Sequence, residues 1–257
     1  MLIDSKGCEF GSELILVVSK VYSEMKRNSE IGVVTSKLMK PFYFFLSDDK
    51  IVEKYTNRKA GSPWGDLHSP TLPNDFDYPD FKSHYNQFEL PFDIDKEVIL
   101  VSNKYNTEWN HDPVNFLDIP TLREIFTILS KKYLVVYNRV KSNKIVGDNS
   151  DILELGDYEL VNEFENVIDL NTIFSSYTIN ELQLVIGAHA KHKISVQGGT
   201  SIISSLTGGE NDIFVVNGGE LEHDTFGKWY NRFSDCKIRT HSTYESLINR
   251  VKEITDE

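Results

Sequence analysis

Residues 193–206 could bind a phosphate group, because they combine a short apolar strand, a turn with two glycines and the start of a helix. The first backbone N–H groups of a helix have no intrahelical partner and lie at the positive end of its dipole. Hydroxyl side chains in the first turn can add hydrogen bonds to the same anion. The segment therefore predicts an anion site formed by Gln197, Gly198, Gly199, Thr200 and Ser201. A turn that only joins a strand to a helix would have the same sequence.

Two cations follow predicted strands where their side chains could reach such an anion. Lys104 follows a strand over 97–102, and Arg139 follows a strand over 133–137. The carboxyl ends of parallel strands lie at one edge of a sheet, where α/β domains bind their ligands. Glu220 follows a further strand and two glycines, and could accept hydrogen bonds from ribose hydroxyls. The alternatives are exposed loop cations and a polar surface turn.

The elements that must position these residues alternate between strands and helices. A strand over 1–3, a helix over 13–26 and a strand over 31–35 form a βαβ opening, which implies parallel pairing. After residue 96, apolar strands alternate with helices that start at Asp118 or Thr121, at the capping box of Thr178 with Glu181, and at a second box of Ser242 with Glu245. This alternation predicts a doubly wound α/β domain.

We therefore expect two α/β units, residues 1–95 and 96–257, with a long irregular loop over 56–92 in the first. Five of the eight prolines lie in that loop, among aspartates and aromatic residues. Trp64 and Tyr78 in this loop could stack on the sugar rings of an acceptor. The alternative is that the loop packs its own small apolar core.

Composition excludes several classes of protein. The chain has 257 residues, 40% of them hydrophobic and 26% charged, which is typical of a soluble globular protein. Its net charge of −12, without a basic patch, argues against a nucleic-acid partner. No apolar run approaches the roughly 20 residues of a membrane span. The absence of a signal-peptide pattern and two distant cysteines, Cys8 and Cys236, favour a cytoplasmic location.

Three segments resemble GT-B glycosyltransferases of the heptosyltransferase kind. Gly11, Ser12 and Glu13 before a buried helix resemble the N-terminal motif of that family, and Lys104 with Trp109 resembles its lysine and tryptophan loop. Residues 167–216 resemble the segment that holds the nucleotide diphosphate. The family's aspartate–serine–glycine loop with a histidine is here replaced by residues 197–200.

The resemblance implies two Rossmann-like units whose parallel sheets face each other across a cleft. It implies transfer of a sugar from a nucleotide diphosphate sugar to a glycan or another hydroxyl acceptor, with inversion and without a metal or cofactor. A helix N-terminus and one or two cations can stabilise a diphosphate leaving group. Direct displacement needs a base, and the resemblance implies Glu13, with Glu9 as second choice. A purely structural glutamate that stabilises the helix dipole is the alternative for Glu13.

Other chemistries have weaker signals. Asp48 with Asp49 and Asp75 with Asp77 faintly resemble the metal-binding acids of GT-A glycosyltransferases, but the first pair more simply ends a strand after the aromatic residues 42–46. The seven histidines lack zinc-ligand spacing, and neither a Walker loop nor a Gly-x-Gly-x-x-Gly motif is present. A nucleotide-sugar epimerase or hydrolase of the same fold, or a non-catalytic nucleotide- or glycan-binding protein, are the alternative functions.

Overall fold

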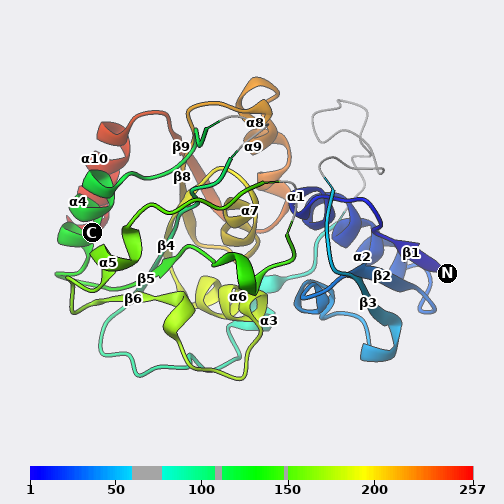
Figure 1. Ribbon diagram of the computed structural model, residues 1–257. Coiled ribbons are helices and arrows are strands. Elements are labelled where there is room, and N and C mark those ends of the chain that lie inside the picture. The colour runs from blue at the N-terminus through cyan, green and yellow to red at the C-terminus, as the bar shows by residue number, and fades with distance from the viewer. Residues whose placement is uncertain (60–76, 108–111, 148–149, 257) are drawn as a thin grey trace.

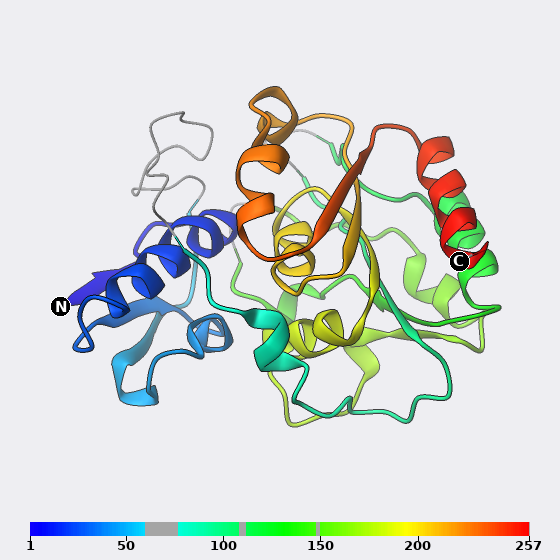
Figure 2. The same ribbon diagram turned by 180° about the vertical axis from the view of Figure 1, so that it is seen from behind.

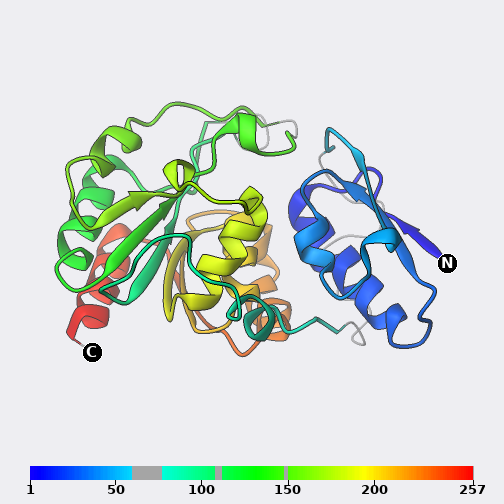
Figure 3. The ribbon, with the colours of Figure 1, turned by 90° about the horizontal axis from the view of Figure 1, so that it is seen from below.

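The computed structural model describes residues 1–59, 77–107, 112–147 and 150–256. Three of the candidate residues named above, Trp64, Asp75 and Trp109, lie outside the described residues. The chain forms two lobes, each built on a parallel sheet (Figure 1). Figure 3 shows the lobes side by side, with the segment that follows residue 77 running from one to the other.

The N-terminal lobe contains a three-stranded sheet in the order β1 (Leu2–Asp4), β2 (Gly32–Ser36) and β3 (Ile51–Tyr55). The helix between β1 and β2 consists of α1 (Phe10–Ser12), a π-helical turn η1 (Glu13–Val18) and α2 (Ser19–Met25). All six residues of η1 are buried, since the apolar residues predicted for this helix cover most of its circumference. The predicted βαβ opening is therefore present.

The aromatic residues after β2 do not form a strand. Their segment contains two short 3₁₀ turns, η2 (Lys40–Tyr43) and η3 (Asp48–Lys50), and the strand β3 follows them. The prediction that Asp48 and Asp49 end a strand is wrong. Pro41 in the first turn has no N–H to donate to a sheet, and the aromatic side chains of Phe42 and Tyr43 are buried in the core instead.

The C-terminal lobe contains six parallel strands. In spatial order they are β6 (Val167–Asp169), β5 (Leu134–Asn138), β4 (Val98–Ser102), β7 (His192–Val196), β8 (Glu210–Phe214) and β9 (Lys237–His241). Numbered along the chain within this lobe, the order is 3-2-1-4-5-6, the doubly wound arrangement of dinucleotide-binding domains. Strand order therefore reverses between β4 and β7.

Three helices of this lobe begin at, or one residue from, the N-caps predicted from the sequence. α4 (Ile119–Leu129) is capped by Asp118, and α6 (Ile179–His189) by the predicted box of Thr178 and Glu181. α10 (Tyr244–Asp256) is capped by Thr243, whose hydroxyl accepts from the Ser246 N–H. A single cap at Thr243 thus begins this helix in place of the predicted box of Ser242 with Glu245. The remaining helices are α5 (Asp157–Val161), α7 (Gly199–Leu206), α8 (Gly219–Glu222) and α9 (Thr225–Lys228).

The segment over 77–95 joins the lobes and packs onto the second one. It contains α3 (Phe81–Tyr85), which lies beside α6 (Figure 2). This short helix was not predicted, because the prolines around it obscure its pattern. One continuous apolar cluster includes residues of η1, α3, α6 and α7, so apolar contacts hold the lobes together. None of the described helices is long and apolar enough to cross a membrane.

Candidate functional site

A ligand of a doubly wound sheet binds where the strand order reverses, outside the carboxyl ends of the strands. Here that position lies between the loop after β4, which carries Lys104, and the loop after β7, which carries Gln197 and Gly198. The Lys104 ammonium donates to the Gln197 Oε1 at 3.1 Å, so the two loops meet there. The predicted lysine and the predicted glycine turn are therefore brought together.

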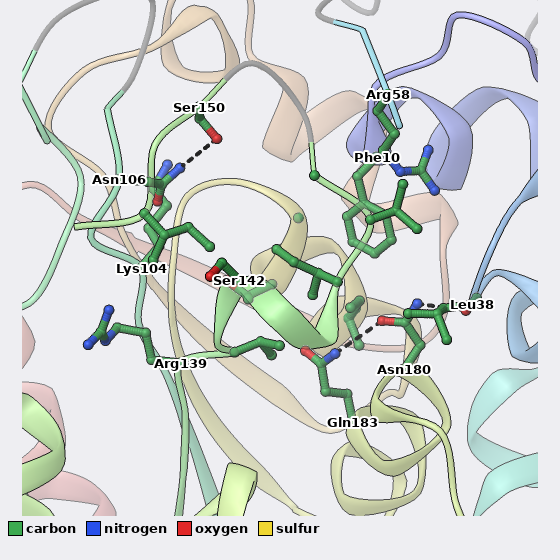
Figure 4. A pocket seen from close by; sticks show the side chains of 18 of the residues that line it. Phe10, Leu38, Arg58, Lys104, Asn106, Arg139, Ser142, Ser150, Asn180 and Gln183 are labelled. Atoms are coloured by element: carbon green, nitrogen blue, oxygen red, sulfur yellow. Dashed lines mark hydrogen bonds between the residues drawn. The ribbon is translucent and has the colours of Figure 1, made fainter. Parts of the chain in front are cut away.

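A cavity of about 430 Å³ opens at this position and lies between the lobes (Figure 4). The C-terminal lobe supplies its floor from the loops after β4 and β5 and from α6 and α7. The N-terminal lobe closes it with residues that follow its own strands or begin its helix: Phe10, Lys37, Leu38 and Arg58. The carboxyl edges of both sheets therefore face one cavity.

The start of α7 presents backbone N–H groups at this cavity. Gly199 and Thr200 line it, and no hydrogen bond among the described residues uses the N–H of Gly198, Gly199 or Thr200. Gly198 has φ 124°, a conformation that favours glycine, and a Cβ there would lie 3.3 Å from the Lys104 Nζ. The helix is eight residues long, so its dipole adds to the attraction for an anion.

Not every predicted residue of this turn faces the cavity. The Ser201 hydroxyl is hydrogen-bonded to the Gly198 carbonyl at 2.8 Å and to the Tyr230 hydroxyl at 2.9 Å. The Gln197 side chain is 5% exposed, and its Oε1 accepts from Lys104 and from Asn115 Nδ2. Both side chains therefore hold the turn in place, and the backbone is what a ligand would meet.

Glu220 is tied to the same network. The Gln197 Nε2 donates to the Glu220 Oε1 at 2.5 Å, and Asn115 binds the backbone at Asn217. The loops after β4, β7 and β8 are thus connected through Gln197. Glu220 does not line the cavity, and its position in the structure is that of a support for Gln197.

Arg139 lines the cavity with a charge that is already paired. Its Nε and Nη2 donate to the two carboxylate oxygens of Asp157 at 2.5 and 2.6 Å, and both residues are buried. Burial lowers the pKa of the Arg139 guanidinium, but the hydrogen bonds and charge of Asp157 outweigh it and leave the pKa raised. Figure 4 shows this guanidinium directed away from Phe10 and Arg58.

Glu13 is paired in the same way in the other lobe. Its carboxylate is completely buried, and Arg58 donates to its Oε2 at 2.6 Å, while Thr35 and Tyr43 donate to its Oε1. Burial, and then the charge of Glu13, raise the pKa of the Tyr43 hydroxyl well above its usual value. Glu9, the second predicted base, accepts from the Ser12 hydroxyl at 3.1 Å. Neither glutamate lines the cavity.

Arg58 lies between Glu13 and the cavity and was missed by the sequence analysis. It follows β3, in a region predicted to be irregular, so no strand pattern marked it. Its guanidinium lies 5.2 Å from the centre of the Phe10 ring, and its backbone N–H donates to the Gly147 carbonyl of the other lobe at 2.9 Å. The N-terminal lobe thus places a cation and an aromatic ring opposite Lys104.

The Phe10 ring packs against the first residue of α7. A Cβ on Gly199 would lie 2.5 Å from the Phe10 Cδ1, so only glycine fits there without a shift of the ring. Phe10 therefore covers part of the α7 N-terminus, whereas Thr200 and Lys104 remain on the cavity wall.

One carboxylate lines the cavity among the described residues, and it was not predicted. Asp151 is exposed and lies on the segment that follows η4 (Ser142–Lys144). The same wall contains Asn106, whose Nδ2 donates to the Ser150 hydroxyl at 3.4 Å. No helix or strand pattern marks this segment, so its sequence gives no sign that Asp151 reaches the cavity.

The predicted acceptor residue Tyr78 lies away from the cavity. It is 8% exposed, its hydroxyl donates to the Ile15 carbonyl at 2.6 Å, and its ring packs edge-on against Phe233 with centroids 4.9 Å apart.

Asp77 forms an ion pair with Lys26. In the described ranges, no group of three or more His, Cys, Asp or Glu side chains is placed to hold a metal ion.

Comparison with known proteins shows the fold. No protein-family model matches this sequence, and no curated protein matches it either. ADP-heptose LPS heptosyltransferase II of E. coli is similar over 100% of this chain and 99% of its own, with a TM-score of 0.62 and 10% sequence identity. This chain has the GT-B fold. The predicted fold class and the predicted resemblance are thereby confirmed.

A second similar structure, the wall teichoic acid polymerase TagF, matches 88% of this chain and 50% of its own at 14% identity and a TM-score of 0.38. That score is too low to support an argument about this chain. At 10% identity the likeness to the heptosyltransferase concerns the fold alone, so function must be argued from the site.

Proposed function

We propose that this protein is a glycosyltransferase that moves a sugar from a nucleotide diphosphate sugar to a hydroxyl group of a glycan or another acceptor. The proposal rests on one observation. Lys104 and the start of α7 meet where the strand order reverses, and Lys104, Gly199 and Thr200 line a cavity closed by the carboxyl edge of a second sheet. The similar E. coli structure is that of an ADP-heptose heptosyltransferase, which supports the same class of donor.

The diphosphate would lie against the start of α7, with Lys104 beside it. As the bond to the sugar breaks, negative charge grows on the leaving diphosphate, and fixed N–H groups with a cation stabilise that charge. Arg58 adds positive potential from the opposite lobe, although Glu13 offsets part of it. These groups can take over the role that a metal ion plays elsewhere, so we propose a metal-independent reaction.

The acceptor hydroxyl needs a base on the cavity wall. We assign this role to Asp151, because it is the carboxylate that lines the cavity among the described residues. We assign to Glu13 the role of holding Arg58 in place, because its carboxylate is buried behind that guanidinium. Direct attack on the sugar carbon would invert its configuration.

The donor is tested by thermal unfolding with uridine, guanosine, adenosine and cytidine diphosphate sugars in the presence of EDTA. A ligand at about 100 times its Kd adds roughly 2.7 kcal/mol to the free energy of unfolding. At least one of the four should raise the Tm, and if none does the proposal is rejected. Turnover of the donor without any acceptor would point instead to an epimerase or a hydrolase.

The base is tested by comparing Asp151→Asn with Glu13→Gln. Loss of a general base lowers kcat by about 10²- to 10⁴-fold. Asp151→Asn should show that loss with unchanged donor affinity and unchanged Tm. Full activity in Asp151→Asn, with loss of kcat in a folded Glu13→Gln protein, would return the role of the base to Glu13.

A further inference from the structure

A second group of chemically competent side chains lies at the β9 edge of the large sheet, where α10 covers β8 and β9 (Figure 1). His241 ends β9, and Ser246 lies in the first turn of α10. The His241 Nδ1 lies 2.9 Å from the Ser246 Oγ, and its Nε2 lies 2.9 Å from the Asp212 Oδ1 on β8. A hydroxyl, an imidazole and a carboxylate are therefore connected in series.

Their burial follows the order that nucleophilic catalysis requires. Asp212 is completely buried, His241 is 8% exposed, and Ser246 is exposed to solvent. The Arg250 Nε lies 3.5 Å and the Arg239 Nη1 3.9 Å from the Asp212 Oδ2, so both cations attract the carboxylate without a hydrogen bond to that oxygen. This attraction offsets part of the cost of burying the charge. The acid thus orients the imidazole, and the hydroxyl faces outward.

A surface depression of about 480 Å³ gives access to this hydroxyl. Every residue that lines it is polar or charged: Arg239, His241, Thr243, Glu245, Ser246, Asn249, Arg250 and Glu253. Ser246 also lies at the start of a 13-residue helix, whose dipole favours negative charge near its first turn. Each of these features favours attack by the Ser246 oxygen on an electrophile bound in the depression.

We propose that Ser246, His241 and Asp212 form a second catalytic site, which hydrolyses short acyl esters of polar alcohols. The nucleophile–base–acid arrangement is recognised by geometry and not by the order of the residues in the chain. The depression lacks apolar lining residues, so it suits a small acyl group such as acetyl on a hydroxylated compound, and not a long acyl chain. The site is independent of the cavity between the lobes.

The reaction balances with water as the only co-reactant. The Ser246 Oγ bonds to the carbonyl carbon of the ester, and its proton passes to the His241 Nδ1. The ester C–O bond breaks, and the alcohol leaves with that proton. Water then gives a proton to the same nitrogen and attacks the acyl-serine, which releases the carboxylic acid and restores the Ser246 hydroxyl.

The test uses the full chain and a fluorophosphonate probe, with the labelled residue identified by peptide mass spectrometry. The wild-type protein should be labelled at Ser246, and Ser246→Ala should lose the label. Ser242→Ala is the matched control, because Ser242 is also an exposed serine near α10, and it should keep the label. His241→Gln should slow labelling by about 100-fold or more, as expected for loss of a general base.

Hydrolysis of p-nitrophenyl acetate gives the second readout and should decrease in Ser246→Ala and not in Ser242→Ala. The exposed position of Ser246 means that its alanine variant should fold, which its Tm verifies. If Ser246 in the wild-type protein stays unlabelled, or if Ser246→Ala hydrolyses the ester at the wild-type rate, the assignment is wrong and the three side chains only join α10 to the sheet.

Discussion

The carboxyl edges of the two sheets face the same cavity but present their charges differently. At the edge of the six-stranded sheet, Lys104 and Thr200 line the cavity, and the Lys104 ammonium donates to the uncharged amide oxygen of Gln197. At the edge of the three-stranded sheet, the Arg58 guanidinium is held by the buried Glu13. In our proposal the first edge binds the donor diphosphate, whereas the buried Glu13–Arg58 pair at the second edge stabilises the protein itself.

Arg139 shows the same difference within one lobe. It follows β5 as Lys104 follows β4, yet its guanidinium is bound by both oxygens of Asp157. A cation at the end of a parallel strand is therefore not by itself a sign of ligand binding. The two cations differ in the partners that the structure shows, since Asp157 binds Arg139 and the Gln197 amide oxygen accepts from Lys104.

The largest change in stability is expected at the edge of the three-stranded sheet, where Glu13 and Arg58 form a buried ion pair. Glu13→Gln leaves the Arg58 guanidinium buried without its counter-charge and should lower the free energy of unfolding by about 3 kcal/mol. Urea denaturation measures this change. Glu9→Gln is the matched control and should change stability by less than about 0.5 kcal/mol, because Glu9 is only partly buried. Equal stability of the two variants would show that Glu13 does not stabilise the fold.

A change at the other edge should affect binding and spare stability. Lys104→Ala removes a charged hydrogen bond to the diphosphate, worth about 2 kcal/mol, and should weaken nucleoside diphosphate binding about 10- to 100-fold. Isothermal titration calorimetry measures the affinity, with Lys6→Ala, a change at an exposed residue outside the cavity, as control. If Lys104→Ala binds as tightly as the control, the contrast between the two edges fails.

The contact between the edges can be tested at Gly199. Gly199→Ala would place its Cβ 2.5 Å from the Phe10 Cδ1 and should cost about 1 kcal/mol as the ring shifts. Phe10→Ala in the same chain should relieve that cost, since residues in contact show coupling energies of about 0.5–3 kcal/mol. Denaturation of both single variants and the double variant measures the coupling, and additive effects would show that the ring does not rest on this glycine.

A third charge cluster, around Glu210 on β8, lies outside the cavity lining and predicts how stability changes at acidic pH. Burial would raise the pKa of Glu210, but hydrogen bonds from Arg239 and Lys237 outweigh it and lower the pKa to about 2 from 4.5. Because the folded pKa is the lower one, this stabilisation is present above pH 4.5 and is lost as the pH falls to about 2. Glu210→Gln should flatten the stability profile in that window, whereas an unchanged profile would contradict the pairing.

Local signals in the sequence predicted helices, strands and turns, but they could not predict which distant residues pair with each other. The turn at Gly198 and Gly199, the cap at Asp118 and the box at Thr178 depend on neighbouring residues, so each could be recognised in advance. The Arg58–Glu13 pair joins residues 45 positions apart, and nothing in either segment indicates the other. Asp151 escaped for a related reason, because it lies on an irregular segment that only the tertiary fold brings to the cavity.

The structure of the protein in complex with a nucleoside diphosphate, formed in the presence of EDTA, tests the central claim most directly. We expect diphosphate oxygens within hydrogen-bonding distance of an N–H group among Gly198, Gly199 and Thr200, and of the Lys104 Nζ. A diphosphate bound away from the start of α7, or no complex with any of the four nucleotides, would contradict it.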